Sequence, residues 1–300
     1  MSATDQSTVS AGGLPPARLL TAYDALRRLV AAAAEIRPGL TLAVIFLVVL
    51  IFASLFPDIL APQDPLATDP SHIFVAPSLG HILGTDENGR DVFSRLVHAT
   101  RYSLLLGLSA ALLTTLAGSL VGLVAGLGPR WLDNVVMRIS DVLQSFPEIV
   151  LILVVIAFWG ASMATLLVSL GVTGLSRCAR QVRAQVLVLR RAPFVEAALT
   201  LGLPRWRVVL RHVLPNAIKP VLVLLPIHIG MKISAVATLS FLGLGAPPPA
   251  PNWGGMLAID RDYVLNAWWV AGAAAGIIVI TVLSVATLGR DLIRRSEGRR

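Results

Sequence analysis

Charged residues are scarce in this chain of 300 residues. They make up 14% of the sequence, whereas a soluble globular domain carries about 25%, and apolar residues make up 55%. This shortage of charge excludes an ordinary soluble domain and indicates a protein that lies largely in lipid. Because a helix needs about 20 apolar residues to cross a bilayer, the length allows about six spans joined by modest loops.

Cysteine and the common catalytic motifs are also nearly absent. The single cysteine, Cys178, excludes a disulfide within the chain and a metal cluster held by thiolates, and we expect it to be a small packing residue at a helix end. The chain lacks Gly-x4-Gly-Lys-Ser/Thr, the loop that cradles phosphates in nucleotide hydrolases. It also lacks an obvious nucleophile and base. We therefore expect no enzyme activity, no catalytic residue, no bound metal and no cofactor.

Acidic residues are outnumbered by basic ones, 17 to 25, which gives a formal charge of +8. In a soluble protein this balance would suggest a nucleic-acid partner. Here the basic residues lie beside apolar segments, where they favour an anionic membrane face. We expect the lipid bilayer, and no nucleic acid, to be the partner of these charges.

Six apolar segments predict an all-α, polytopic membrane protein. They are residues 39–56, 103–127, 142–160, 162 to beyond 175, 218–242 and 268–288. In the second segment, Gly118, Gly122 and Gly126 recur at every fourth position and predict the close approach of a neighbouring helix. Residues 1–38 are predicted to be a cytoplasmic, partly disordered N-terminal segment with an amphipathic stretch over 19–36.

The distribution of arginine and lysine predicts the orientation of these spans. Residues 176–220 are strongly basic, with Glu196 as their only acid, and the two chain ends are basic as well. With six spans, all of these regions fall on one side, which the positive-inside rule makes the cytoplasm. Both termini are then cytoplasmic, and the loops 57–100 and 246–267 lie outside.

The basic segment contains a predicted helix, turn and second helix. Pro193 suits the first turn of a helix, Glu196 complements the positive end of its dipole, and Gly202 can take the left-handed conformation that ends a helix. Pro204 begins the second helix and Pro215 is expected to stop it. This arrangement would lie along the membrane surface.

Ala197 and Ala198 give the first of these helices a face of low relief. Such a face allows a groove on another protein to close over it. The alternative is a pair of interfacial helices without a protein partner. Helix physics does not separate these two interpretations.

Five sequence blocks, in order along the chain, resemble a known family. One of them covers Glu196-Ala197-Ala198, Gly202, His212 and Leu214-Pro215-Asn216, and it resembles the signature loop in the permease subunits of bacterial ATP-binding-cassette (ABC) importers. The others resemble the second permease subunit of dipeptide, oligopeptide and nickel importers. They are residues 83–95 (LGTDENGRDVFSR), 141–147 (DVLQSFP), 239–245 (LSFLGLG) and 251–257 (PNWGGML).

The resemblance implies a multi-pass permease of the bacterial inner membrane. It would form half of a translocation path for di- or oligopeptides, driven by ATP hydrolysis on other chains. The implied partners are a second homologous permease, two ATPase subunits and an extracytoplasmic solute-binding protein. The alternatives are a nickel or metal-chelate importer of the same architecture and a stand-alone secondary carrier.

The resemblance also implies a division of the chain. Residues 39–100 would be a first membrane helix with an extracytoplasmic loop, and residues 101–295 the permease core with five spans. A cytoplasmic coupling loop, residues 190–220, would dock into an ATPase. The residues implied to couple are Glu196, Ala197, Ala198, Gly202, His212 and Pro215.

His228 and Lys232 are four residues apart in the fifth predicted span, so they share a helix face. Lys232 would lie about 20 Å along a helix that starts near Ile218, close to the middle of the membrane. A lysine there costs at least about 2.5 kcal/mol, so it should face a cavity or an acid. Our hypothesis is that both residues line the translocation path and meet a substrate carboxylate. The alternatives are an ion pair with an acid of the partner permease, or a lysine that reaches to the membrane surface.

The predicted outer loop carries alternating acids and arginines over residues 86–95. Asp86 and Arg90 are four apart, as are Asp91 and Arg95, so they would pair on a short helix. We interpret this cluster as a structural element or a docking surface for the binding protein.

Overall fold

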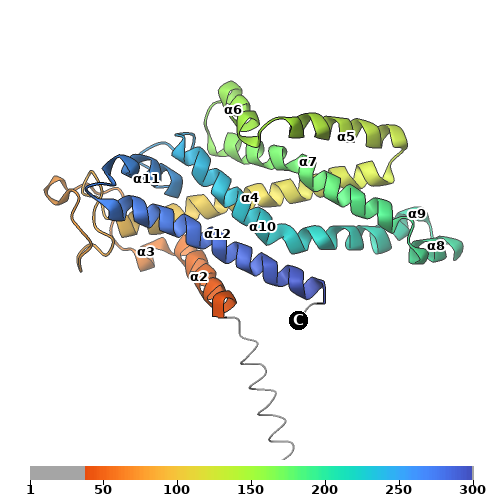
Figure 1. Ribbon diagram of the computed structural model, residues 1–300, viewed down its shortest axis with the longest axis horizontal. Coiled ribbons are helices and arrows are strands. Elements are labelled where there is room, and N and C mark those ends of the chain that lie inside the picture. Colours follow the sequence, from red (N-terminus) through yellow and green to blue (C-terminus); the bar gives the residue numbers. More distant parts are fainter. Residues whose placement is uncertain (1–37, 299–300) are drawn as a thin grey trace, which may run out of the picture.

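In the computed structural model, which describes residues 38–298, the chain folds into long helices packed side by side (Figure 1). The longest in this range are α2 (Pro38–Leu55), α4 (Val92–Leu127), α7 (Met163–Leu189), α10 (Leu214–Phe241) and α12 (Trp268–Ser296). The predicted N-terminal segment lies outside the described residues, except for Pro38. Within the described range, the only β pairing is an isolated bridge between Thr85 and Asp91.

Shorter helices connect the long ones. α11 (Trp253–Asp260) and the loop 61–91 lie at one end of the molecule, and α8 (Pro193–Thr200) and α9 (Arg205–Val208) lie at the opposite end (Figure 1). The remaining α-helices in the described range are α3 (Pro57–Leu60), α5 (Arg130–Ser145) and α6 (Glu148–Trp159). The two groups of connecting segments are thus separated by the length of the long helices.

Within residues 38–298, four helices are long and apolar enough to cross a membrane: α2, α4, the continuous helix over residues 205–241, and α12. The bent pair of α5 and α6 is a fifth candidate. The fourth predicted span corresponds to α7, whose second half carries Arg177, Arg180 and Arg183. The described part of the chain is therefore a helical, polytopic membrane protein with four or five candidate spans by length and composition.

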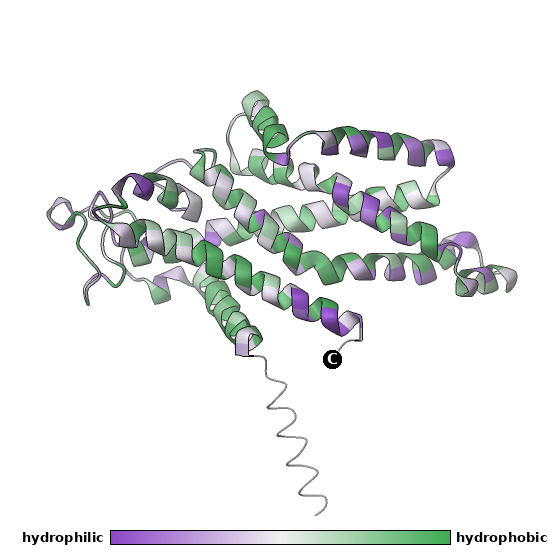
Figure 2. Ribbon diagram, in the orientation of Figure 1, coloured by the Kyte–Doolittle hydropathy of each residue, from purple (hydrophilic) through white to green (hydrophobic). Residues whose placement is uncertain are grey.

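The long helices consist largely of hydrophobic residues (Figure 2), and many of their large apolar side chains are exposed. On α4, Leu116 is 69% exposed and Leu120 is 64% exposed. Apolar surface of this extent needs apolar surroundings, which lipid or another membrane subunit provides. The location of α2 agrees with the predicted first span to within one residue at each end.

The glycines of the second predicted span allow α4 to pack closely against α7, as predicted. A Cβ added to Gly118 would lie 2.6 Å from the Cβ of Cys178, and one added to Gly122 would lie 2.4 Å from the carbonyl oxygen of Ala179. Any larger side chain would therefore separate the two helices. Cys178 is buried, as expected, but it lies in the middle of α7 and the predicted location at a helix end is wrong.

The third predicted span, residues 142–160, is not a single helix. α5 ends at Ser145 and α6 begins at Glu148, and the two helix axes differ by 93°. The break falls at Phe146, whose extended backbone (φ −98°, ψ 144°) is the conformation that a following proline, Pro147, favours. α6 has 12 residues and is about 18 Å long, too short to cross the bilayer alone.

The expected stop at Pro215 is also wrong. The helix that begins at Arg205 continues to Phe241, and Pro215 lies in its first part. A π-helical turn over Val209–Val213 precedes the proline, with the Leu214 N–H bonded to the Val209 carbonyl. This wider turn changes the spacing just where the proline ring would crowd the preceding turn, so the helix continues.

Residues 85–91 form a turn, and the short helix predicted there is absent. Asp86 accepts hydrogen bonds from the N–H groups of Asn88 and Arg90, both at 2.9 Å, and pairs with the Arg90 Nε at 2.8 Å. Asp91 caps the start of α4 by accepting from the Ser94 N–H at 2.8 Å. Arg95, within α4, reaches back to Asp86 at 3.3 Å instead of pairing with Asp91.

Candidate functional site

The first helix of the predicted coupling loop is α8, with Pro193 in its first turn as predicted. Gly202, at φ +83°, follows its end. The Gly202 N–H donates to the Leu199 carbonyl and the Leu203 N–H donates to the Ala198 carbonyl, at 3.0 and 3.2 Å. This pair of bonds satisfies the last carbonyls of the helix and fixes the direction of the chain.

α8 is attached to the rest of the protein by one face. Val195 and Ala198 are buried in a cluster with residues of α7 and α10, among them Val182 and Ala217. Glu196 and Ala197 remain exposed. The two alanines therefore have different surroundings, and only Ala197 contributes to an outer surface.

An exposed apolar surface surrounds this end of the molecule. Leu201 is 82% exposed and Trp206 is 61% exposed, and Phe194, near the start of α8, is exposed as well. Contact with water disfavours such a group of exposed apolar side chains unless another molecule covers them. His212 and Pro215 lie beyond this tip, in and just after the π-helical turn, where the Asn216 side chain donates to the His212 carbonyl at 2.7 Å.

Lys232 is buried on α10, with only 7% of its surface exposed. Its Nζ donates to Glu148 Oε1 of α6 at 2.7 Å. The acid that pairs with it is therefore on the same chain. The alternative of an acid on the partner permease is therefore not needed to explain the buried lysine.

Sequence reasoning missed Glu148. It is the only acid in residues 142–160, and it begins an apolar run directly after Pro147. An isolated acid next to a proline, at the start of an apolar helix, indicates that a basic group lies nearby in the fold. A charge within a membrane needs such a partner. The structure shows that this partner comes from α10, 84 residues further along the chain.

Three donors converge on Glu148. Besides Lys232, the Thr173 Oγ1 donates at 3.1 Å, and an Arg177 guanidinium nitrogen lies 3.5 Å from Oε2. A Cβ added to Gly174 would come within 2.9 Å of the Lys232 Nζ, so the glycine leaves room for the lysine. The carboxylate thus connects α6, α7 and α10.

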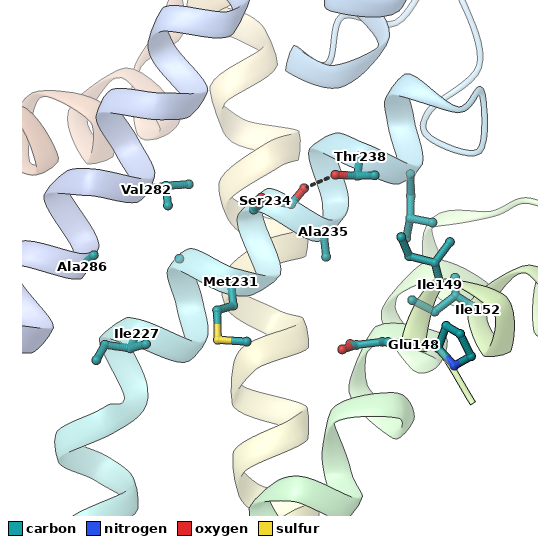
Figure 3. A pocket seen from close by; sticks show the side chains of 13 residues that line it. Glu148, Ile149, Ile152, Ile227, Met231, Ser234, Ala235, Thr238, Val282 and Ala286 are labelled. Carbon is teal, nitrogen blue, oxygen red and sulfur yellow. Dashed lines mark hydrogen bonds between the residues drawn. The ribbon is translucent and has the colours of Figure 1, made fainter. Parts of the chain in front are cut away.

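Two cavities meet at this ion pair. The larger, of ≈590 Å³, is an open cleft lined mainly by apolar residues of α6, α10 and α12. In Figure 3 the Glu148 carboxylate and Met231 both extend into this cleft. The smaller, of ≈110 Å³, is lined by polar and charged groups that include Arg177, His228 and Lys232.

His228 lines the smaller cavity. Its Nδ1 is buried and has no hydrogen-bond partner among residues 38–298. His228 and Lys232 are therefore brought together as predicted, next to Glu148 and Arg177. Such an arrangement can bind a charged or polar group.

Comparison with known proteins identifies the family. Residues 118–297 match the model of the binding-protein-dependent transport system inner membrane component. The chain belongs to this family. It is therefore a permease subunit of an ABC transport system and a multi-pass protein of the inner membrane.

Relatives match over most of the chain. A glutathione transport system permease of Pectobacterium atrosepticum is 38% identical, with 83% of each chain covered. A dipeptide transport system permease of Alkalihalophilus pseudofirmus is 35% identical, over 85% of this chain and 82% of the relative. A di/tripeptide transport system permease of Pseudomonas aeruginosa is 34% identical, over 83% and 84%.

A crystal structure of an amino acid ABC transporter with histidines has a similar fold. The TM-score is 0.51 at 18% identity, and the match covers 64% of this chain and 90% of the other. At this level of identity the likeness shows the fold alone.

Proposed function

We propose that this permease forms half of the translocation path for di- or oligopeptides. The observation that carries the proposal is the match, over more than four fifths of the chain, to permeases named for dipeptides, di- and tripeptides and glutathione. These names favour peptides over nickel or a metal chelate. Membership of a binding-protein-dependent family disfavours a stand-alone secondary carrier.

The proposed partners are a second homologous permease, two ATPase subunits and an extracytoplasmic solute-binding protein. ATP hydrolysis then takes place on the ATPase chains, and this subunit has no catalytic or cofactor role. The family description supports dependence on a binding protein. The open cleft between α6, α10 and α12 fits a path that a second permease completes.

We propose six spans, with both termini in the cytoplasm. α7 is the fourth of these spans, and two of its arginines are paired with acids of α5: Arg183 with Asp133 and Arg180 with Asp141. Such pairing lowers the cost of charge near the membrane. Residues 39–100 form the first span and outer loop, and residues 101–295 form the permease core.

The coupling loop, residues 190–220, is proposed to dock into an ATPase subunit. Support comes from the exposed apolar surface at Leu201 and Trp206 and from the rigid ending of α8 at Gly202. Because Val195 and Ala198 anchor α8 to α7 and α10, a force applied at the tip reaches the membrane helices. ATP-driven closure can then bias the equilibrium between two packings of the permease.

This coupling is tested with the complete complex in proteoliposomes. We expect Glu196→Lys or Gly202→Pro to lower the peptide taken up per ATP hydrolysed by about tenfold, a usual size of coupling between sites. Asp262→Lys, a charge reversal at the opposite end of the molecule, is the control. Unchanged uptake per ATP in both loop variants would refute the coupling role, and a wild-type complex that transports no peptide would refute the proposed cargo.

His228 and Lys232 are proposed to line the path. They share one face of α10 beside the cleft, and Lys232 is held there by Glu148. We expect Lys232→Met to reduce peptide uptake in an assembled complex. Normal uptake by a stable Lys232→Met complex would contradict this role.

A further inference from the structure

The small cavity next to Glu148 has a surplus of positive charge. Its charged lining consists of one acid, Glu148, and two cations, Lys232 and Arg177. Lys232 and Glu148 neutralise each other at 2.7 Å. Among the described residues, Arg177 makes one long contact, of 3.5 Å, to Glu148, and its side chain is 58% exposed. One guanidinium is thus left with most of its donors available for another acceptor.

The surplus charge lies beside the buried ion pair, far along a membrane helix. Arg177 is 14 residues after the start of α7, about 21 Å along the helix, and it reaches the same carboxylate as Lys232. A charge at such a depth is costly, and its usual explanation is a role in binding or transport. Since Lys232 already neutralises Glu148, structural pairing does not account for Arg177.

His228 provides a second polar group without a partner. Its side chain lines the same cavity, and its buried Nδ1 bonds to none of the described residues. A buried polar nitrogen without a hydrogen bond is unfavourable, so an occupant that bonds to it is stabilised. Arg177 and His228 together offer a cation and a neighbouring hydrogen-bonding group, which suits a carboxylate.

The dimensions of the two cavities match the two parts of a peptide. The small cavity, of ≈110 Å³, has room for three or four waters at about 30 Å³ each, or for one carboxylate group. The adjoining cleft, of ≈590 Å³, is mostly apolar and large enough for side chains. Glu148, Met231 and Ala235 line both, so a ligand can extend from one into the other.

We propose that the small cavity is a subsite for the C-terminal carboxylate of the transported peptide, bound by Arg177 and His228. The ion pair between Lys232 and Glu148 forms its wall and stays intact. The proposal rests on the peptide cargo and deepens it, because it assigns a carboxylate contact within the membrane path. Arg177 then selects for a free carboxyl end after the binding protein has released its cargo.

The test compares two cargoes in proteoliposomes that contain the complete complex. One is a peptide with a free C-terminus and the other is its C-terminal amide, chosen as a pair that the solute-binding protein binds equally. We expect Arg177→Gln to slow uptake of the free acid about tenfold, the effect of losing a charge-assisted hydrogen bond, and to leave uptake of the amide unchanged. Arg177→Lys, which keeps the positive charge, should retain part of the preference for the free acid over the amide.

The matched control is Arg180→Gln. Arg180 lies one helical turn further along α7, pairs with Asp141, and does not line either cavity. The Arg180→Gln substitution should not change the ratio between the uptake rates of the free acid and the amide. Uptake of the amide also shows that the Arg177 variants are folded and assembled.

Two results would overturn the subsite. If Arg177→Gln slows both cargoes equally, Arg177 has only a structural role. If it slows neither, the carboxylate does not bind there. In both cases wild-type peptide uptake persists, so the proposed cargo survives, whereas a complex that takes up neither peptide refutes the cargo itself.

Discussion

Two clusters of charge in this permease, one around Asp86 and one around Glu148, are built in opposite ways. The outer cluster is local: Asp86 binds Arg90 and Arg95, and Arg90 also binds Glu87 at 2.7 Å. The inner cluster joins Glu148 to Thr173 and Lys232 from two other helices. The first determines the course of a loop, whereas the second holds three helices together.

The clusters also differ in their balance of charge. With Asp260 of α11 nearby, the outer one has three acids and two arginines, and the inner one has two cations and one acid. Burial, followed by repulsion from Glu87 and Asp86, raises the pKa of Asp260 to about 7. Excess acid at the outer cluster therefore favours protonation, whereas excess cation at the inner cluster favours an anionic ligand.

The largest effect is expected from Glu148→Leu. This change leaves Lys232, 7% exposed, without its carboxylate, and removing one partner of a buried ion pair costs about 3–5 kcal/mol. Thermal unfolding of the purified complex in detergent would measure the loss.

The double variant Glu148→Leu with Lys232→Met tests the cause. Replacing both charges by apolar groups should recover most of the lost stability, because no buried charge is left unpaired. If the double variant is as unstable as the single one, the carboxylate stabilises the helices in some other way.

At the outer cluster, we expect stability to depend on the protonation of Asp260. Its folded pKa of about 7 lies above the unfolded value of about 3.9, so its stabilising contribution is complete below pH 4 and is lost as the pH rises through 7. Asp260→Asn should remove this dependence and, above pH 8, exceed the wild type by up to roughly 4 kcal/mol.

Unfolding temperatures of both forms between pH 5 and pH 9 would check this prediction. The groups that surround Asp260 are Asp86, Glu87, Arg90 and Arg95, and the variant leaves them unchanged. Parallel pH profiles for the two forms would show that Asp260 is ionised throughout the range.

A smaller effect is expected from Gly174→Ala. The added Cβ would lie 2.7 Å from Thr114 Cγ2 and 2.9 Å from the Lys232 Nζ, so it should displace the lysine and cost about 1–3 kcal/mol. Gly276→Ala on α12 is the control, since its Cβ meets no described atom within 4 Å. There, alanine should stabilise the helix by about 0.5–1 kcal/mol. Equal changes in unfolding temperature would contradict the crowding at Gly174.

The smallest effect is expected at Arg180. Its pair with Asp141 is 48% and 57% exposed, and such pairs contribute about 0–1 kcal/mol. Arg180→Gln should therefore change the unfolding temperature little, and any difference should shrink as salt is added. A large loss would mean that this pair is shielded in the assembled complex.

Features controlled by neighbouring residues were predictable. The glycines at 118, 122 and 126 implied the close packing of α4 against a neighbour, and Gly202 implied the turn after α8. Proline was a poorer guide. Pro147 bends its helix by 93°, whereas Pro215 is absorbed by a π-helical turn, and nothing in either local sequence distinguishes the two outcomes.

The inner site was only half predictable, because its parts are distant in the chain. The spacing of His228 and Lys232 on one helix follows from helical geometry, but Glu148 is 84 residues away from Lys232.

The residues alone predict a lipid-embedded helical chain, a buried lysine that needs a partner and a helix that ends at Gly202. These features are predictable because hydropathy and backbone preference act over a few residues. The identity of that partner, the surplus charge of Arg177 and the shape of the cleft emerge when α6, α7 and α10 pack together. Electrostatic pairing depends on distance in space, and folding sets that distance.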